Sequence, residues 1–242
     1  MAEVADQDNV SSLDKVGDYL QRMTMEAIRN GVGPITGASA YADDRLERVQ
    51  DSRIGRETSP SMNDGSAAGG NAATASDRDA AIRMVIRESV VAAGTQGFVT
   101  GLGGFVAMPV MLPANLAGSL IINARMVGAI AHLRGYDLED PHTQAVMMLT
   151  VAGSSVQATS SAVGVKVGAS FAKQAIAAVP IAVIRQINKR AGVFLIAKYG
   201  TKRSVLTLSN AVPGVGGLVG GTVDAALTRA IGRTALTLFS EG

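Results

Sequence analysis

The two histidines are the side chains best suited to hold a metal or transfer a proton, and both lie in one short stretch. His132 and His142 are separated by three carboxylates, Asp137, Glu139 and Asp140. A zinc site needs three or four ligands, and carboxylates would have to complete it because the chain contains no Cys. The spacing matches no metal-binding motif, and Asp140 precedes a proline, which is typical of a helix start. The sequence therefore predicts no metal ion and no cofactor.

A group of serines and two glycine runs could be taken for catalytic or nucleotide-binding motifs. A serine nucleophile needs a base and a residue that orients it, and the chain contains no GxSxG motif. The runs GLGG at 101–104 and GVGGLVGG at 214–221 have no preceding strand, and no lysine follows them to meet a phosphate. We therefore expect no enzymatic activity, and we expect the serines to hydrogen-bond within or between helices. They are Ser154, Ser155, Ser160 and Ser161.

Two charged residues stand alone in long uncharged segments. Arg125 is the one such residue in 114–133, and Asp224 is the one in 204–228. An unpaired charge in apolar surroundings is unfavourable, so each should have a partner. The sequence predicts that their helices pack together and that the two side chains form a buried ion pair. Two alternatives stay open: Arg125 reaching a lipid phosphate, and Asp224 bonding to Arg229 or to a backbone donor.

Glycines at four-residue spacing predict close contact between helices. A GxxxG pair removes the side chains that would hold two backbones apart, in a membrane or in a tight soluble core. Aromatic residues make up only 4% of the chain and Trp is absent, so small residues must supply much of the packing. The glycines concerned are Gly97, Gly101, Gly104, Gly216, Gly217, Gly220 and Gly221.

The charges are distributed unevenly along the chain. Residues 1–88 carry a net charge of −5 and residues 89–242 a net charge of +7, and no acidic residue lies between Asp140 and Asp224. Bases interleaved with aliphatic residues in this interval suit a helix on an anionic membrane surface, or equally a solvated face over a soluble core. Nucleic acid is disfavoured because no aromatic residues are interspersed. The candidate membrane-binding residues are Arg185, Lys189, Arg190, Lys198, Lys202 and Arg203.

The elements that would position these residues are helices. Apolar residues at three- and four-residue spacing predict an amphipathic helix at 11–30, and a short charged helix is expected at 40–50. The small polar residues that follow have little to bury and predict a disordered linker. Asp77 is expected to cap the next helix. The predicted organisation is all-α: an N-terminal helical arm at 1–50, the linker at 51–76, and a domain of about seven Gly-rich, closely packed apolar helices at 77–240.

The apolar centre of the chain has a more specific pattern. No charged residue occurs from Ser89 to Ala124, a stretch of 36 positions. The segment 108–113 contains two prolines and predicts a turn, because proline lacks an amide donor and restricts the residue before it. A helix should follow, with Gly135 as its C′ residue. No sheet is expected. The remaining helices are predicted at 141–164, 166–178, 180–199, 201–210 and 213–239.

Three blocks, taken in this order, resemble the EcsC family. They are TGLGGFVAMPVMLPANL at 100–116, GYDLEDP at 135–141 and VPGVGGLVGGTVDAALTRAIGRTALTLF at 212–239. The resemblance covers about two-thirds of the chain, from Asp77 to Phe239, and leaves most of residues 1–76 outside. It implies an all-helical bacterial protein of a family named after a locus with an ABC transporter. It carries over no active-site residues.

These patterns favour a non-enzymatic protein at the cytoplasmic membrane face, peripheral or shallowly inserted, that assists transport or secretion or interacts with lipid. The expected partner is an anionic lipid membrane, with an ABC transporter or another membrane protein as a further candidate and an oligomer left open. Two alternatives are a soluble helical carrier of a lipid-like ligand and a pore-forming toxin. The acidic N-terminus lacks the basic and apolar regions of a secretory signal peptide, so none is expected.

Overall fold

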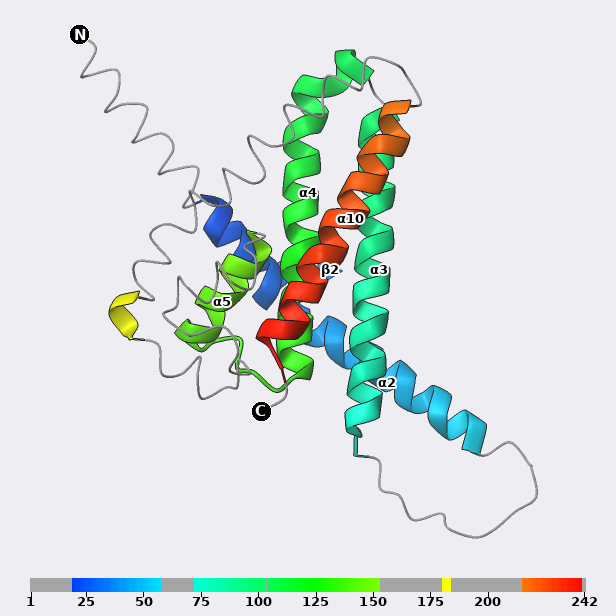
Figure 1. Ribbon diagram of the computed structural model, residues 1–242, viewed down its shortest axis with the longest axis vertical. Helices are drawn as coiled ribbons and strands as arrows, with labels where there is room; N and C mark the ends of the chain where they lie inside the picture. The colour runs from blue at the N-terminus through cyan, green and yellow to red at the C-terminus, as the bar shows by residue number, and fades with distance from the viewer. Residues whose placement is uncertain (1–18, 58–71, 103, 153–179, 184–214, 241–242) are drawn as a thin grey trace.

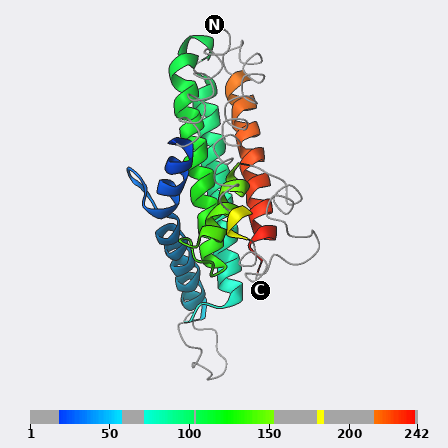
Figure 2. The same cartoon turned by 90° about the vertical axis from the view of Figure 1, so that its left-hand side faces the viewer.

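The computed structural model describes residues 19–57, 72–102, 104–152, 180–183 and 215–240. Within these residues the backbone is helical apart from turns, helix ends and one two-stranded hairpin. The predicted all-α class is confirmed. Three long helices lie alongside one another and form a rod, with shorter elements packed around its lower half (Figure 1). Seen from the side, the rod is much longer than it is thick (Figure 2).

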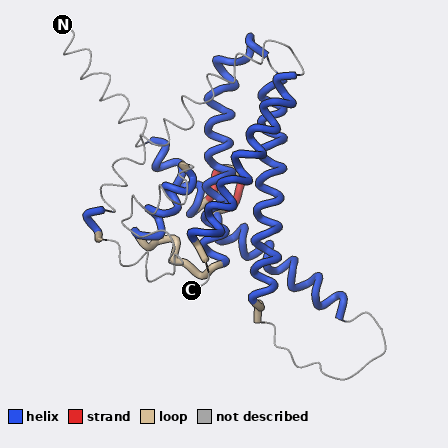
Figure 3. Tube along the Cα trace, viewed as in Figure 1, coloured by secondary structure: helices blue, strands red, loops and turns tan. Residues whose placement is uncertain are grey.

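The rod is a helical hairpin with a third helix beside it. Helix α3, Ala75–Leu102, and helix α4, Gly104–Leu133, form the hairpin, and α10, Val215–Leu238, runs back along α3. The reversal therefore lies between Leu102 and Gly104, and the predicted turn at 108–113 is wrong. Both prolines of that segment are inside α4, whose upper end is bent relative to the rest (Figure 3). Proline inside a helix removes a hydrogen bond and bends the axis without having to end the helix.

The N-terminal residues are not a detached arm. Residues 19–29 are helical, and Ala27 and Ile28 are fully buried in the core. The strands β1, Gly31–Val32, and β2, Ile35–Thr36, follow as an antiparallel hairpin, which corrects the expectation of no sheet. Gly33 and Pro34 form its two-residue turn, and Gly33 has a positive φ of 58°, as a type II′ turn requires at its first central position. Gly-Pro between two β-branched residues was the signal that could have predicted it.

Helix α2, Ala38–Glu57, joins this N-terminal region to the rod. It is longer than the predicted helix at 40–50, because it continues through the first seven residues of the predicted linker. It crosses α4 and α3 diagonally, and Ala38, Tyr41 and Ala42 are buried against them (Figure 1). Residues 58–71 of the predicted linker lie outside the described residues.

The ends of the helices follow from local capping chemistry. Asp77 does not cap α3 from the N-cap position: it lies in the first turn and accepts a hydrogen bond from the amide of Thr74, while the Thr74 hydroxyl accepts one from the amide of Asp77. This reciprocal pair is a capping box in which Thr74 is the N-cap. At the C-terminus of α4, Gly135 has φ 73°, and the amide of Tyr136 donates to the carbonyl of Ala131. Gly135 is therefore the predicted C′ residue of a Schellman motif.

Helix α5, Pro141–Val151, begins at the predicted residue. Asp140 is its N-cap, and the Asp140 carboxylate accepts from both the amide and the hydroxyl of Thr143. The helix ends at Val151 with Ala152 as C-cap, well before the predicted end at 164. Tyr136, just before it, packs edge-on against Phe239, and the Tyr136 hydroxyl donates to the carbonyl of Ser240. These contacts fix the α4–α5 connection to the end of α10.

Replacing Asp140 with alanine is expected to lower the free energy of unfolding by about 1–2 kcal/mol, because the first turn of α5 loses its side-chain acceptor. Asn retains an acceptor oxygen, so Asp140→Asn should lose less. Urea unfolding followed by circular dichroism at 222 nm measures both values. Equal stability of Asp140→Ala and wild type would contradict the capping role.

Candidate functional site

Backbone atoms of α3 and α10 come into contact where glycines of the two helices face each other. A Cβ added at Gly97 would lie 2.7 Å from the carbonyl oxygen of Gly220, and one added at Gly220 would lie 2.7 Å from the carbonyl oxygen of Gly97. A Cβ added at Gly221 would lie 2.7 Å from the carbonyl oxygen of Gly94. Gly94 was not among the predicted glycines. Such distances exclude any side chain. Of the other predicted glycines, Gly217 is buried in the first turn of α10, which also contains Gly216. Gly101 is in the last turn of α3 and Gly104 is the first residue of α4, so the two lie on either side of the reversal.

The predicted ion pair between Arg125 and Asp224 is not formed. No ion pair among the described residues joins them, and their neighbours differ. Asp224 is buried on α10 beside Gly97, where a Cβ would come within 2.5 Å of its Oδ2. Arg125 on α4 extends instead toward α2, where its guanidinium lies 4.1 Å from the centre of the Tyr41 ring. The prediction fails because α2, which was assigned to a separate arm, supplies the partner.

Tyr41 is the centre of a cluster that binds α2 to the rod. The Tyr41 hydroxyl donates to Oε2 of Glu88 on α3 at 2.8 Å, and Nε of Arg45 donates to the same oxygen at 2.7 Å. The Arg45 guanidinium is 4.6 Å from the Tyr41 ring centre, so two cations, those of Arg45 and Arg125, lie over one ring. Cation–π contacts strengthen when desolvated, and Tyr41 is only 4% exposed. We name Tyr41, Arg45, Glu88 and Arg125 the tyrosine cluster.

The cluster shifts the pKa of its members. Burial raises the pKa of Tyr41 to about 12, and the hydrogen bond to Glu88 acts in the same direction against the two arginines. Burial alone would raise the pKa of Glu88, but the hydrogen bonds from Arg45 and Tyr41 outweigh it and lower that pKa. Burial lowers the pKa of Arg125, and the Nε atom of this side chain has no hydrogen-bond partner among the described residues. Tyr41 and Arg45 of α2 bind Glu88 of α3, and Arg125 of α4 contacts the same ring, so the cluster holds three helices together; we call this arrangement a helix clamp.

An open groove of about 820 Å³ runs between α2 and α3 beside the cluster. Its charged residues, Arg48, Asp51, Arg87 and Glu88, balance one another in number, and Val91 borders it on α3. The groove therefore has no strong preference for an anionic or a cationic ligand. Within the described residues, no group of three or more His, Asp or Glu side chains could hold a metal ion.

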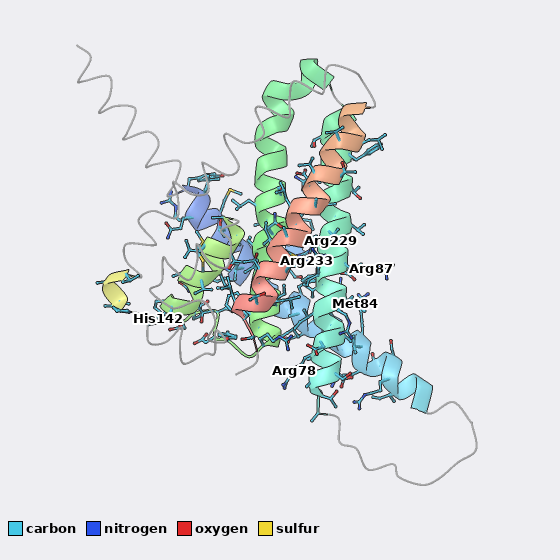
Figure 4. All side chains as sticks on the ribbon, viewed as in Figure 1. Arg78, Met84, Arg87, His142, Arg229 and Arg233 are labelled. Atoms are coloured by element: carbon cyan, nitrogen blue, oxygen red, sulfur yellow. The ribbon has the colours of Figure 1, made fainter. Side chains whose placement is uncertain are left out.

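A set of exposed arginines lies along one side of α3 and α10. Two occur one turn apart on α3, and two occur one turn apart on α10. None of the four forms an ion pair with a residue that the structure describes. Figure 4 shows Arg87, Arg229 and Arg233 at a similar height on the two neighbouring helices, with Arg78 near the foot of α3. We name the four the arginine face: Arg83, Arg87, Arg229 and Arg233.

Every carboxylate of α3 and α10 is engaged away from the arginine face or buried. Asp77 is held by Thr74 and lies 3.6 Å from Arg53. Asp79 pairs with Arg134 at 2.9 Å. Glu88 is bound in the tyrosine cluster, and Asp224 is buried. Asp51 of α2, which lines the groove together with Arg87, is one acidic neighbour, so among the described residues the arginine face keeps an excess of positive charge, and this favours a polyanionic partner.

Exposed apolar side chains gather at the upper end of the same two helices. Phe98 is 38% exposed, Val99 53% and Leu218 64%. They lie toward the end of α3 and the start of α10, where the rod extends beyond α2 and α5 (Figures 1 and 2). Apolar side chains grouped at one end of a molecule indicate an interaction site. We name Phe98, Val99 and Leu218 the apolar end.

The family model described as the EcsC protein family matches residues 14–241. The chain belongs to the EcsC family. The match begins far upstream of Asp77, so the N-terminal region that the sequence resemblance left outside is part of the EcsC unit, in keeping with the burial of Ala27, Ile28 and Tyr41. Comparison with curated proteins and with solved structures gives no match.

The histidines, serines and bases singled out from the sequence can now be compared with the structure of this EcsC protein. His142 contacts the N-cap Asp140, and His132 binds Asp43 of α2 at 2.8 Å, so the two histidines serve different contacts. The four serines and the six candidate membrane-binding bases at 185–203 lie outside the described residues. In the part of the chain that the structure describes, no helix combines the length and hydropathy of a membrane span. The arginine pairs were missed, although each occurs as RxxxR, at 83–87 and at 229–233.

Proposed function

We propose that this EcsC protein is a non-enzymatic, peripheral membrane protein that attaches to an anionic lipid surface through the upper end of its rod. The observation that carries the proposal is the exposure of Phe98, Val99 and Leu218 at the end of two helices whose connection continues the uncharged stretch 89–124. Apolar side chains presented beside cationic ones are the composition of an interfacial anchor. The proposal includes a role beside a transporter or in lipid remodelling, either of which requires such attachment.

The anchor is supported by the way the rod is built. α3 and α10 approach through Gly94, Gly97, Gly220 and Gly221, which contribute no side chain to the contact, and the neighbouring Phe98 and Leu218 remain partly exposed. Covering such side chains is favourable, because full burial of one large apolar side chain contributes about 1.5–3 kcal/mol of transfer free energy from water. Attachment to lipid supplies that cover.

Replacing both Phe98 and Leu218 with serine is expected to weaken binding to vesicles of anionic phospholipid about tenfold or more. The two side chains are partly exposed, so about 1 kcal/mol of transfer free energy each is at stake. Co-sedimentation with sucrose-loaded vesicles at a series of lipid concentrations gives the partition coefficient. The matched control is the double variant Tyr19→Ser and Ile54→Ser, which removes two apolar side chains of similar exposure from other elements.

The control should bind as the wild type does. Equal weakening of both double variants would show that the upper end of the rod is not the anchor. Failure of the wild-type chain to bind vesicles at low salt would contradict the proposed function itself.

A further inference from the structure

We propose that the arginine face binds the phosphate groups of anionic phospholipids and fixes the rod tip-first in the membrane, with the apolar end below it. This inference rests on the proposed function and deepens it by assigning the lipid headgroup site and the orientation. None of its four arginines is among the bases that the sequence pattern nominates. The occupant is the lipid phosphate in a bilayer rather than free phosphate.

The four arginines share one side of the rod. A Cβ added at Gly232 would lie 3.4 Å from the Ile86 side chain, while Gly97 meets Gly220, so α3 and α10 are antiparallel. Arg87 directly follows Ile86, and Arg233 directly follows Gly232, so each arginine is one residue after a position at which the two helices touch. In both helices the next residue is rotated by about 100° in the same sense. In an antiparallel pair such positions fall on one common face. Residues one turn away, Arg83 and Arg229, add to it.

The same face becomes apolar toward the upper end of the rod. Phe98 lies three turns above Arg87 on α3, and Leu218 lies three turns above Arg229 on α10. Both separations are eleven residues, or about 16 Å along the helix axis. With the arginines at the phosphate level, a rod perpendicular to the bilayer would place both side chains roughly 10 Å inside the hydrocarbon. Arg87 and Arg229 of the two helices therefore lie at one depth, and Phe98 and Leu218 lie together at a greater depth.

Charge complementarity decides the class of partner. Among the described residues, the carboxylates of α3 and α10 are committed to Thr74, Arg134 and the tyrosine cluster or are buried beside Gly97. Asp51 of α2 shares the groove with Arg87, which still leaves the arginine face with more positive than negative charge. Guanidinium groups match phosphate geometry well. An acidic protein would also meet the charge, but it would leave the adjacent apolar end in water, whereas a phospholipid surface satisfies both.

The test measures binding of the full chain to vesicles of phosphatidylglycerol in phosphatidylcholine at low salt. The double variant Arg87→Gln and Arg229→Gln is expected to bind roughly 30-fold more weakly, because each cation near an anionic surface contributes about fivefold. The control, Arg22→Gln and Arg29→Gln, makes the same change of net charge on another helix and should lose less than threefold. Arg87→Lys with Arg229→Lys keeps the charge and should retain most of the binding.

The chain contains no Trp, so a single substitution supplies a depth probe. The indole of Phe98→Trp should be quenched by phospholipid brominated in the acyl chain, and that of Tyr19→Trp should not. Quenching of both, or of neither, would overturn the tip-first orientation.

The outcomes separate this inference from the proposed function. If the arginine variants bind as the wild type does while the Phe98→Ser and Leu218→Ser variant does not, the membrane role stands and the arginine face is not the phosphate site. If 10 mM inorganic phosphate displaces the protein from vesicles at constant ionic strength, the face binds soluble phosphate and the lipid assignment is wrong. Absence of vesicle binding by the wild type would remove both proposals.

Discussion

Replacing Tyr41 with alanine is expected to lower the free energy of unfolding by about 3–5 kcal/mol, the range for removing a buried aromatic side chain. The loss combines a cavity beneath α2 with the disappearance of the ring that Arg45 and Arg125 contact. It also leaves Glu88 with Arg45 as its hydrogen-bond partner in the cluster. Urea unfolding monitored by circular dichroism at 222 nm measures the change.

Tyr41→Phe is the matched variant, because it keeps the ring and both cation–π contacts but removes the hydroxyl that donates to Glu88. We expect it to lose about 1.5–3 kcal/mol, the contribution of a hydrogen bond to a charged group. If Tyr41→Ala and Tyr41→Phe are destabilised equally, the stacking of the two arginines on the ring contributes nothing and the helix-clamp interpretation is wrong.

The same cluster predicts a change of stability at alkaline pH. The folded protein raises the pKa of Tyr41 from about 10 to about 12, so folding favours the protonated phenol. The stabilisation is complete below pH 10 and is lost as the pH rises from 10 toward 12. The difference in urea midpoint between wild type and Tyr41→Phe should therefore shrink over this interval. A constant difference between pH 8 and pH 11.5 would show that the hydroxyl is not protected.

Gly97→Ala is expected to destabilise the fold by about 2–3 kcal/mol, although alanine is the better helix former by about 1 kcal/mol. The added methyl group would lie 2.5 Å from Oδ2 of Asp224 and 2.7 Å from the carbonyl oxygen of Gly220. Neither atom can retreat easily, since one belongs to a buried side chain and the other to a helix backbone. α10 would have to move away from α3, with loss of the packing at Gly94 and Gly221.

Gly55→Ala is the control for this prediction, because Gly55 also lies within a helix but an added Cβ meets nothing within 4 Å. It should be neutral or stabilised by up to about 1 kcal/mol. The two variants thus carry the same substitution with opposite expected signs. Stabilisation of both would show that the α3–α10 contact is looser than the structure indicates.

Sequence patterns by themselves determined the helical class, the family and several helix ends. Asp140 before a proline and Gly135 after an apolar helix were readable because capping depends on a few neighbouring residues. The family match is shown by the whole of 14–241. GxxxG spacing pointed to Gly97 and Gly220, but it could not say that these two meet each other.

The tertiary structure alone decided which segments far apart in the chain come together. Pro109 and Pro113 suggested a turn, but α4 continues through both, because a proline can bend a helix without ending it, and the reversal falls at 102–104 instead. Arg125 found Tyr41 rather than Asp224, because α2 packs across α4 and supplies an aromatic partner that no local pattern links to it. The arginine face likewise exists only because α10 runs antiparallel to α3, which places two RxxxR segments about 140 residues apart side by side. Caps and turns depend on residues that are neighbours in the sequence, whereas packing depends on which distant surfaces fit one another.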